Sequence, residues 1–209
     1  MNVFARSSTI QAQRSSIDAG IEHMRDQVMP ALAEVPGWIG LSLLVDRDSG
    51  RCIVTTAWET EAALHDSADR VRPIRYRAAA IFGSGDAQVE EWEIAVLHRD
   101  HPAPEGACAR VTWARTSQDR LDAAIDGFRD GTLPRMEALD GFSSASLLVD
   151  RATGRCVSCS SCDSAEAMDR NRTQATDIRT AATQQAGVQV TEVSEFELAL
   201  AHLRVPELV

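Results

Sequence analysis

The feature that most constrains this chain is an internal repeat. The stretch GWIGLSLLVDRDSGRC at Gly37–Cys52 recurs as GFSSASLLVDRATGRC at Gly141–Cys156, and EWEIAVLH at Glu91–His98 recurs as EFELALAH at Glu195–His202. Both pairs have the same offset, because 141 − 37 and 195 − 91 both equal 104. Since a repeat of this length encodes one supersecondary unit, the sequence predicts two similar halves.

The offset also predicts where the halves begin and end. It holds upstream to Ile17, which corresponds to Leu121; before Ile17 we expect five extra residues in the first half, so that Arg6 corresponds to Arg115 (115 − 6 = 109, against 104). The stretch RDHPAPEGA has the prolines, glycine and charges of an exposed linker. We therefore predict a first domain at residues 1–98, a linker at 99–107, a second domain at 108–203 and a tail at 204–209.

Each half contains six elements in a recognisable order. In the first half, apolar periodicity and turn residues predict strands at 3–8, 39–46, 51–58 and 90–98, and helices at 15–34 and 58–82, the second interrupted at Pro73. The order β-α-β-β-α-β is that of the ferredoxin-like unit. Because such a sheet has one open face, we predict an α+β fold in which two tandem ferredoxin-like (βαββαβ) domains pack sheet to sheet as an intramolecular pseudo-dimeric α/β barrel.

Composition excludes several classes of function. The chain has 31 acidic and 21 basic residues, a net charge of −10, which opposes binding to nucleic acid or to an anionic membrane. All the basic residues are arginine, so chemistry that needs a lysine Schiff base or a P-loop lysine is excluded. No signal peptide or membrane span is recognisable, and the five cysteines are odd in number, which predicts a cytoplasmic protein with reduced thiols.

The run RCVSCSSC at Arg155–Cys162 raises the question of a metal site. It aligns with RCIVTTAW in the first half, which we predict to be a strand, so that Cys162 occupies the position of Trp58. In a strand Cys156 and Cys162 would lie ~20 Å apart, with Cys159 on the opposite face. Three thiolates so placed cannot share one ion, and we predict no metal here.

The stretch TTAWETEAAL at Thr55–Leu64 carries a family resemblance. A tryptophan closing the third strand, then an acidic residue, a hydroxyl residue and an alanine-rich helix, resembles the dimeric α/β-barrel proteins of the antibiotic-biosynthesis-monooxygenase (ABM) superfamily. The resemblance covers nearly the whole chain, once per half, and is greatest to actinobacterial proteins with two fused copies. It implies relatives that include cofactor-free monooxygenases and haem-degrading enzymes. The latter need a strand-one asparagine and a differently placed histidine, so haem degradation is disfavoured and we expect no cofactor.

The resemblance suggests a ligand site beside Trp58, between sheet and helices. Trp58 is either a core residue or the wall of a site for a flat apolar ligand, with His65, Arg75 and Tyr76 as further ligand-binding residues and weak catalytic candidates. Arg75 belongs to the basic run RVRPIRYR, which is either a solvated helix face or a clamp for an anionic group, and Arg179 is its equivalent. Because Trp58 is Cys162 in the second half, we expect the first half to bind the ligand.

A second group of polar residues recurs in both halves. We expect it to line the barrel interior, either as structural ion pairs or as a polar site with a glutamate base. Its members are Arg6, Glu91, Glu93, Arg115, Glu195 and Glu197.

The sequence thus predicts an ABM-like protein that binds a small apolar or aromatic molecule near Trp58. Two alternatives stay open, a cofactor-independent monooxygenase acting on an aromatic substrate and a non-catalytic scaffold. The expected partner is a small molecule, with no nucleic acid and no membrane, and the internal pseudo-dimer leaves room for a further homodimer.

Overall fold

The computed structural model describes residues 2–209, apart from the side chain of Leu203. The chain divides into two compact units. The first unit contains the residues up to Trp92 together with Leu198–Val205, and the second contains Glu93–Glu197 together with Pro206–Val209. None of the described helices has the length and apolar character needed to span a bilayer.

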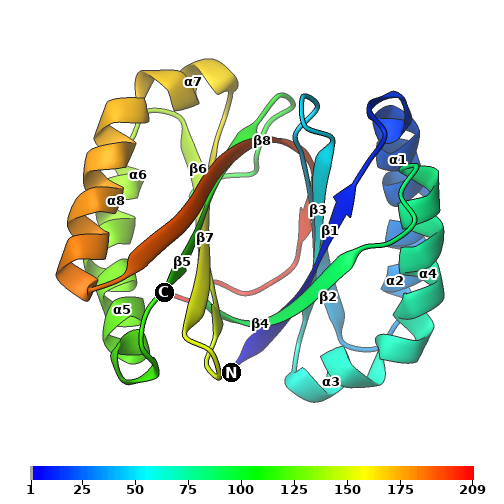
Figure 1. The fold of residues 1–209 in the computed structure, drawn as a ribbon, viewed down its shortest axis with the longest axis horizontal. Helices are drawn as coiled ribbons and strands as arrows, with labels where there is room; N and C mark the ends of the chain where they lie inside the picture. The colour runs from blue at the N-terminus through cyan, green and yellow to red at the C-terminus, as the bar shows by residue number, and fades with distance from the viewer. Residues whose placement is uncertain (1) are drawn as a thin grey trace. The chain divides into compact units, whose positions relative to one another are not determined.

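The first unit contains the elements of the first half in the predicted order (Figure 1). They are β1 (Val3–Gln11), η1 (Arg14–Ser16), α1 (Ile17–His23), η2 (Met24–Val28), α2 (Met29–Ala33), β2 (Trp38–Val45), β3 (Arg51–Trp58), α3 (Glu61–Asp66), α4 (Ala68–Ile81) and the start of β4 (Gln88–Arg99).

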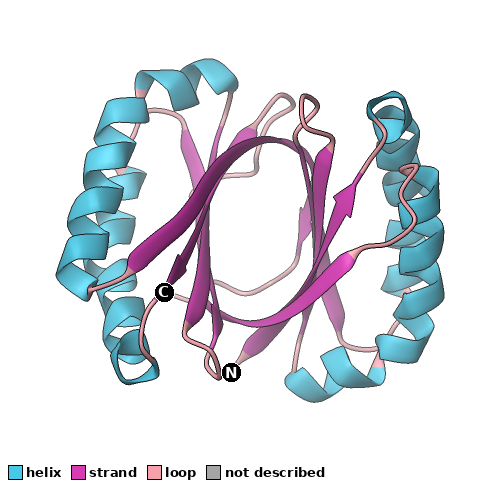
Figure 2. Cartoon of the chain, in the orientation of Figure 1, coloured by secondary structure: helices cyan, strands magenta, loops and turns pink. Residues whose placement is uncertain are grey.

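The same order of elements occurs in the second unit. They are β5 (Cys108–Arg115), η3 (Gln118–Arg120), α5 (Leu121–Gly127), η4 (Phe128–Thr132), α6 (Leu133–Glu137), β6 (Phe142–Asp150), β7 (Arg155–Cys162), α7 (Ala165–Arg170), α8 (Arg172–Ala186) and most of β8 (Gln189–Leu203). In each unit the helices form one layer against one face of the strands, as the cyan and magenta segments of Figure 2 show.

The strands do not form two separate sheets. Among the described residues their hydrogen-bonded order is β1-β3-β2-β8-β5-β7-β6-β4, closed into one antiparallel barrel. The prediction of two ferredoxin-like domains packed sheet to sheet as a pseudo-dimer is therefore wrong. The physical reason lies at the sheet edges, because an unpaired edge strand exposes N–H and C=O groups that are satisfied by another strand and not by face packing.

The register of β1 and β5 corrects the predicted alignment. Arg6 lies opposite Thr56 in the pairing of β1 with β3, and Arg110 lies opposite Ser160 in the pairing of β5 with β7. The offset is 104 here too (110 − 6 = 160 − 56), so the equivalent of Arg6 is Arg110 and not Arg115. The predicted match of Arg6 with Arg115 is wrong because it pairs residues at different positions along the two strands.

Each long helix before the first hairpin contains a π-helical segment. η2 joins α1 to α2, and η4 joins α5 to α6, and Pro30 and Pro134 are the second residues of α2 and α6. A proline has no N–H to donate to the preceding turn, so the local slip to a wider turn is physically reasonable. The helical region has about the predicted extent, residues 15–34, but the sequence did not predict the π-helical segment within it.

The second helical region breaks at a different residue from the one predicted. It divides at Ser67, between α3 and α4, whereas Pro73 lies inside α4. Ser67 Oγ donates to Leu64 O at 2.6 Å and accepts from Arg6 Nη1 at 3.2 Å. The break therefore holds a buried arginine from β1 against the end of α3.

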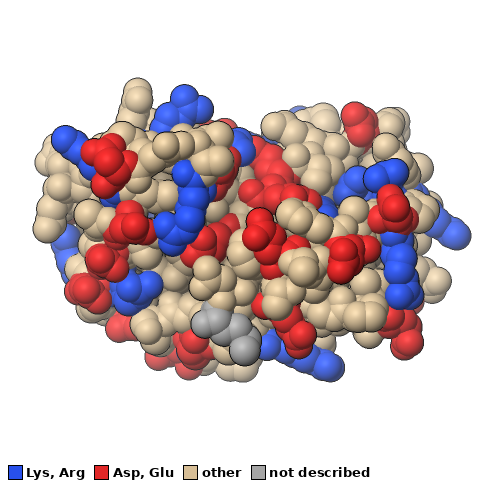
Figure 3. All heavy atoms as spheres, turned by 90° about the horizontal axis from the view of Figure 1, so that it is seen from below, with Lys and Arg blue, Asp and Glu red and all other residues tan. Residues whose placement is uncertain are grey.

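Arginine, aspartate and glutamate side chains are all exposed on the face seen in Figure 3, and carboxylates cover more of that face than arginines do. This mixture agrees with a chain whose net charge is −10 but which still carries 21 arginines.

Candidate functional site

The second unit contains a large cavity between its helices and its strands. Its volume is about 850 Å³, within the ~300–1,000 Å³ that is usual for small-molecule sites. Strands β5, β6 and β7 form one wall, and α5, η4, α6 and α8 form the other. The apolar part of the lining includes Leu121, Ile125, Phe128, Leu147, Val149 and Ile178.

The equivalent space in the first unit is nearly filled. It measures about 30 Å³, roughly the room of one water molecule. Two fully buried aromatic residues, Trp58 and Phe82, belong to the core there. Their equivalents in the second unit are Cys162 and Ala186, both of which line the cavity. The loss of these two large side chains is the main reason that the second unit is open.

Smaller substitutions add to this difference. Ile10, Val54 and Val71 line the small first-unit space. Their equivalents Ala114, Ser158 and Ala175 line the large cavity.

A glycine confirms how tightly the first unit is packed. An ideal Cβ at Gly20 would lie 2.3 Å from Cε1 of Phe82, so only glycine fits beside that ring. In the second unit the facing pair is Ala124 and Ala186, and both line the cavity.

The expected site beside Trp58 is not an open pocket. Trp58 is fully buried, and its Nε1 donates to Thr56 Oγ1 at 3.2 Å. The indole thus occupies the space where we expected a ligand. We predicted that the two halves differ at this position, with the open site in the first. The open space is in the second unit instead, because the tryptophan fills the first-unit space and does not line it.

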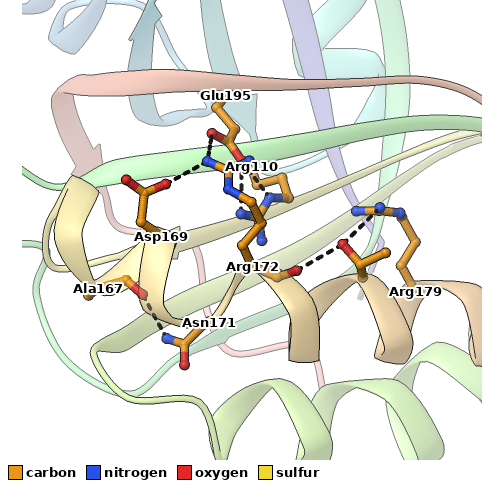
Figure 4. A network of polar contacts seen from close by, with 8 residues as sticks. Arg110, Ala167, Asp169, Asn171, Arg172, Arg179 and Glu195 are labelled. Carbon is orange, nitrogen blue, oxygen red and sulfur yellow. Dashed lines mark hydrogen bonds and ion pairs between the residues drawn. The ribbon is translucent and has the colours of Figure 1, made fainter.

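One end of the second-unit cavity is polar (Figure 4). Arg110 is buried on β5 and donates through Nε and Nη2 to Glu195 Oε1, at 3.0 and 2.8 Å. Arg172 donates to both oxygens of Glu195, each at 2.9 Å, and to Asp169 at 2.6 Å. Burial favours a raised pKa for Glu195, but hydrogen bonds from Arg172 and Arg110 outweigh it and hold the pKa below its ordinary value. Glu195 is therefore a carboxylate at neutral pH.

Two further polar residues of α8 and its start line this end. Arg179 is half-buried and projects from α8 toward the strands in Figure 4. Burial lowers its pKa, and the charge of Arg110 lowers it further. Asn171 is buried and donates Nδ2 to Asp140 O and Ala167 O, which fixes the turn between α7 and α8.

Two thiols line the cavity on the β7 side, Cys156 and Cys162. Burial raises the pKa of Cys156 to about 11 and also raises the pKa of Cys162. Both are therefore protonated at neutral pH and act as small apolar wall residues.

The four residues predicted to bind a ligand in the first unit do not surround one cavity. Trp58 is in the core, and Arg75 lines the small space together with Arg6. His65 is exposed, with Nε2 3.4 Å from Glu91 Oε2. Tyr76 is 54% exposed and lies outside the lining. Their predicted roles are untested, but the geometry brings only Arg75 to the space.

The recurring polar residues were predicted to line the barrel interior, and this is wrong for the residues that form ion pairs. Arg6 donates to Glu91 Oε1 at 2.8 Å and to Leu64 O of α3 at 2.7 Å, so this pair faces the helices. Trp92 points the opposite way and donates to Ser7 Oγ at 2.9 Å. The prediction assigned these side chains to the wrong face of their strands.

The remaining members of that group differ in their surroundings. Glu93 binds Arg151, which also contacts Asp122 of α5 at 2.7 Å, and it too faces the helices. Arg115 is exposed at the end of β5, and Glu197 lies opposite Cys108 in the register of β5 with β8.

The cysteine run forms strand β7, as predicted. Cys156 lies opposite Val149 of β6 and Cys162 opposite Phe142, at the two ends of the pairing. Within the described residues, no group of three His, Cys, Asp or Glu side chains is placed to hold a metal ion.

Sequence reasoning missed Arg110, Arg172 and the cavity itself. A signal was present, because extending the offset of 104 to the first strand places Arg110 under Arg6. The same offset places Ala186 under Phe82, and two large-to-small changes at core positions indicate a space.

Solved structures share this fold. An anthrone oxidase-like protein superposes with a TM-score of 0.70 at 16% identity, covering 100% of this chain and 95% of that chain. A ferredoxin-fold protein from Listeria monocytogenes 4b F2365, described as related to antibiotic biosynthesis monooxygenases, has a TM-score of 0.51 at 10% identity, covering 93% and 94%. The predicted resemblance to ABM-like ferredoxin folds is confirmed at this level, that of the fold.

Much greater similarity is found to two proteins of Mycobacterium tuberculosis (strain ATCC 25618 / H37Rv). "Uncharacterized protein Rv2558" is 57% identical over 208 residues, covering 99% of this chain and 88% of that protein. "Uncharacterized protein Rv2557" is 56% identical over 207 residues, covering 99% and 92%. No family model matches the chain. Identity at this level over nearly the full length means that the chain belongs to the family of Rv2557 and Rv2558.

Proposed function

We propose that the protein binds a small, largely apolar molecule in the cavity of the second unit. The observation that carries this proposal is the contrast between about 850 Å³ in the second unit and about 30 Å³ at the equivalent place in the first. Protein cores are normally packed without such voids, so a large space kept between two apolar walls needs an occupant. The first unit supplies the fold with a closed core, and the second supplies the site.

The walls support an apolar ligand with one polar end. Leu147 and Val149 of β6 face the helices, where Ile125, Phe128 and Ile178 lie. Burial of a ring system or an alkyl chain against these residues would contribute ~25 cal/mol for each Å² removed from water. Affinity in the micromolar range is therefore within reach of the apolar part alone.

The test is a titration of the full-length protein with N-phenyl-1-naphthylamine, an uncharged probe whose fluorescence rises in apolar surroundings. We expect saturable binding of one probe per chain with a Kd of about 1–50 µM. Stoichiometry would be measured by calorimetry on the same sample. Absence of saturable binding would favour the scaffold alternative and refute this proposal.

A cofactor-independent monooxygenase is the second candidate. It is supported by the name of the anthrone oxidase-like structural neighbour and by a cavity large enough for a three-ring aromatic. In such a reaction the CH₂ of anthrone becomes the C=O of anthraquinone; one oxygen atom of O₂ enters the product and the other leaves as water.

For this candidate the expected result is anthraquinone formation at least about tenfold faster than in buffer, with one O₂ consumed per product. Absorbance and an oxygen electrode would follow both quantities. Formation at the buffer rate, with the probe still bound, would leave a binding protein and remove the enzyme candidate.

A further inference from the structure

We infer that the molecule bound in the second-unit cavity is an apolar carboxylic acid whose carboxylate is held by Arg110 and Arg179. This inference rests on the proposed function, because it assigns the chemistry of one end of the same cavity. It is argued from the charges at that end, from the unused donors there and from the comparison with the first unit.

Two guanidinium groups line the polar end of the cavity, those of Arg110 and Arg179, and the carboxylate that binds Arg110, that of Glu195, is shared with Arg172. Arg172 occupies both oxygens of Glu195 and also binds Asp169. In a chain of net charge −10, two arginines at one end of an apolar cavity are a specific feature of this place.

Arg179 is the group left without an anion. Among the described residues it forms no ion pair within 4 Å, and its one hydrogen bond is a long contact of 3.4 Å from Nη2 to Thr176 Oγ1. Burial lowers its pKa and the neighbouring charge of Arg110 lowers it further, while the charge of Glu195 opposes these two effects only in part, so the charged form is destabilised at this site. An anion between the two guanidinium groups would relieve both effects.

Arg6, the equivalent of Arg110, uses hydrogen-bond donors that Arg110 leaves without a partner among the described residues. In the first unit, Arg6 uses Nη1 on Ser67 Oγ and Nη2 on Leu64 O, besides its contacts with Glu91. In the described part of the second unit, Arg110 hydrogen-bonds only to Glu195, through Nε and Nη2. The residue in the place of Ser67 is Asn171, and its Nδ2 donates to backbone carbonyls.

The arrangement of donors favours a carboxylate. Its negative charge suits two neighbouring arginines, and its two oxygens suit the planar donor pattern of guanidinium groups. Because the rest of the lining is mostly aliphatic and aromatic, the acid carries an apolar body.

The experiment compares anthracene-2-carboxylate with anthracene-2-carboxamide, which has nearly the same shape but no charge. Binding of each to the full chain would be measured by calorimetry, in the wild type, in Arg179→Met and in Arg179→Lys. The matched control is Arg170→Met, which removes an exposed arginine of α7 that pairs with Asp140. Arg179 is suited to substitution because it makes a single long contact, so the variants should keep the fold.

We expect the wild type to prefer the carboxylate by at least about tenfold. Arg179→Met should bring this ratio close to one while leaving the carboxamide affinity unchanged, Arg179→Lys should keep part of it, and Arg170→Met should keep all of it. If both compounds bind equally in the wild type, or if Arg179→Met weakens both alike, the carboxylate inference is overturned and the cavity still binds. If neither compound nor the uncharged probe binds, it is the proposed function that fails.

Discussion

Phe82→Ala is expected to lower the free energy of unfolding by about 3–5 kcal/mol. The ring is fully buried in the first-unit core, and its loss would leave a cavity against α1. The exposed neighbour on the same helix provides the control, since Ile81→Ala should change stability by less than about 1 kcal/mol. Urea denaturation followed by circular dichroism measures both. A loss below about 1 kcal/mol for Phe82→Ala would contradict the tight packing described here.

A double-mutant cycle with Gly20 sharpens this prediction. Alone, Gly20→Ala should cost about 1–3 kcal/mol, because the new Cβ would meet the Phe82 ring. In the Phe82→Ala background the same change should be neutral or stabilising, since the methyl group enters vacated space and alanine favours the helix by ~1 kcal/mol. This combination is the one present at Ala124 and Ala186. Strict additivity of the two changes would show that they do not share a space.

Filling the second-unit cavity should abolish ligand binding. The variant Ala124→Gly/Cys162→Trp/Ala186→Phe transfers the three key packing residues of the first unit to their equivalent positions. We expect the affinity for N-phenyl-1-naphthylamine to fall by about 100-fold or more, which is ~2.8 kcal/mol. At ~25 cal/mol per Å², that corresponds to ~110 Å² of ligand surface, less than one aromatic side chain buries.

The control adds the same ring to the other side of the helix. Ala181 is exposed on α8, so Ala181→Phe should leave probe affinity within about twofold of the wild type. Circular dichroism and thermal denaturation would establish that both variants fold. Unchanged affinity in the filled variant would mean that the probe binds elsewhere, and the proposed site would be lost.

Local features of the fold could be predicted from the sequence. The hairpin of β2 and β3 follows from alternating apolar residues around a turn whose Gly50 has a φ of 80°, and Thr60 caps α3 by accepting from Ala63 N. These depend on neighbours in the chain. The joining of strands at the sheet edges depends on pairings outside the ferredoxin-like pattern, such as that of β4 with β6, and the sequence pattern does not encode these directly.

The sequence predicted an apolar site between sheet and helices, but it placed that site in the first half, whereas the large cavity lies in the second unit. The repeat drew attention to the pair Trp58 and Cys162, yet a buried tryptophan either lines a space or fills it, and letters alone do not distinguish the two. The free volume around the tryptophan decides between these two roles, and that volume depends on residues from several helices and strands. Phe82 and Ala186, at helix ends far from that pair in the chain, complete the difference. Arg110 was not predicted as a site residue, because the first strand of the second half was aligned in the wrong register, which matched Arg6 with Arg115.

Two strands serve both units, and this restricts how the chain can change in length. β4 passes from one unit to the other between Trp92 and Glu93, and β8 returns between Glu197 and Leu198. At the first crossing, Trp92 bonds to Ser7 and Glu93 to Arg151, so adjacent residues on opposite faces belong to different units. A one-residue insertion there would exchange the faces of all that follows. The mostly exposed connection at 102–106 can therefore change in length more easily, while the number of residues at both crossings must stay constant.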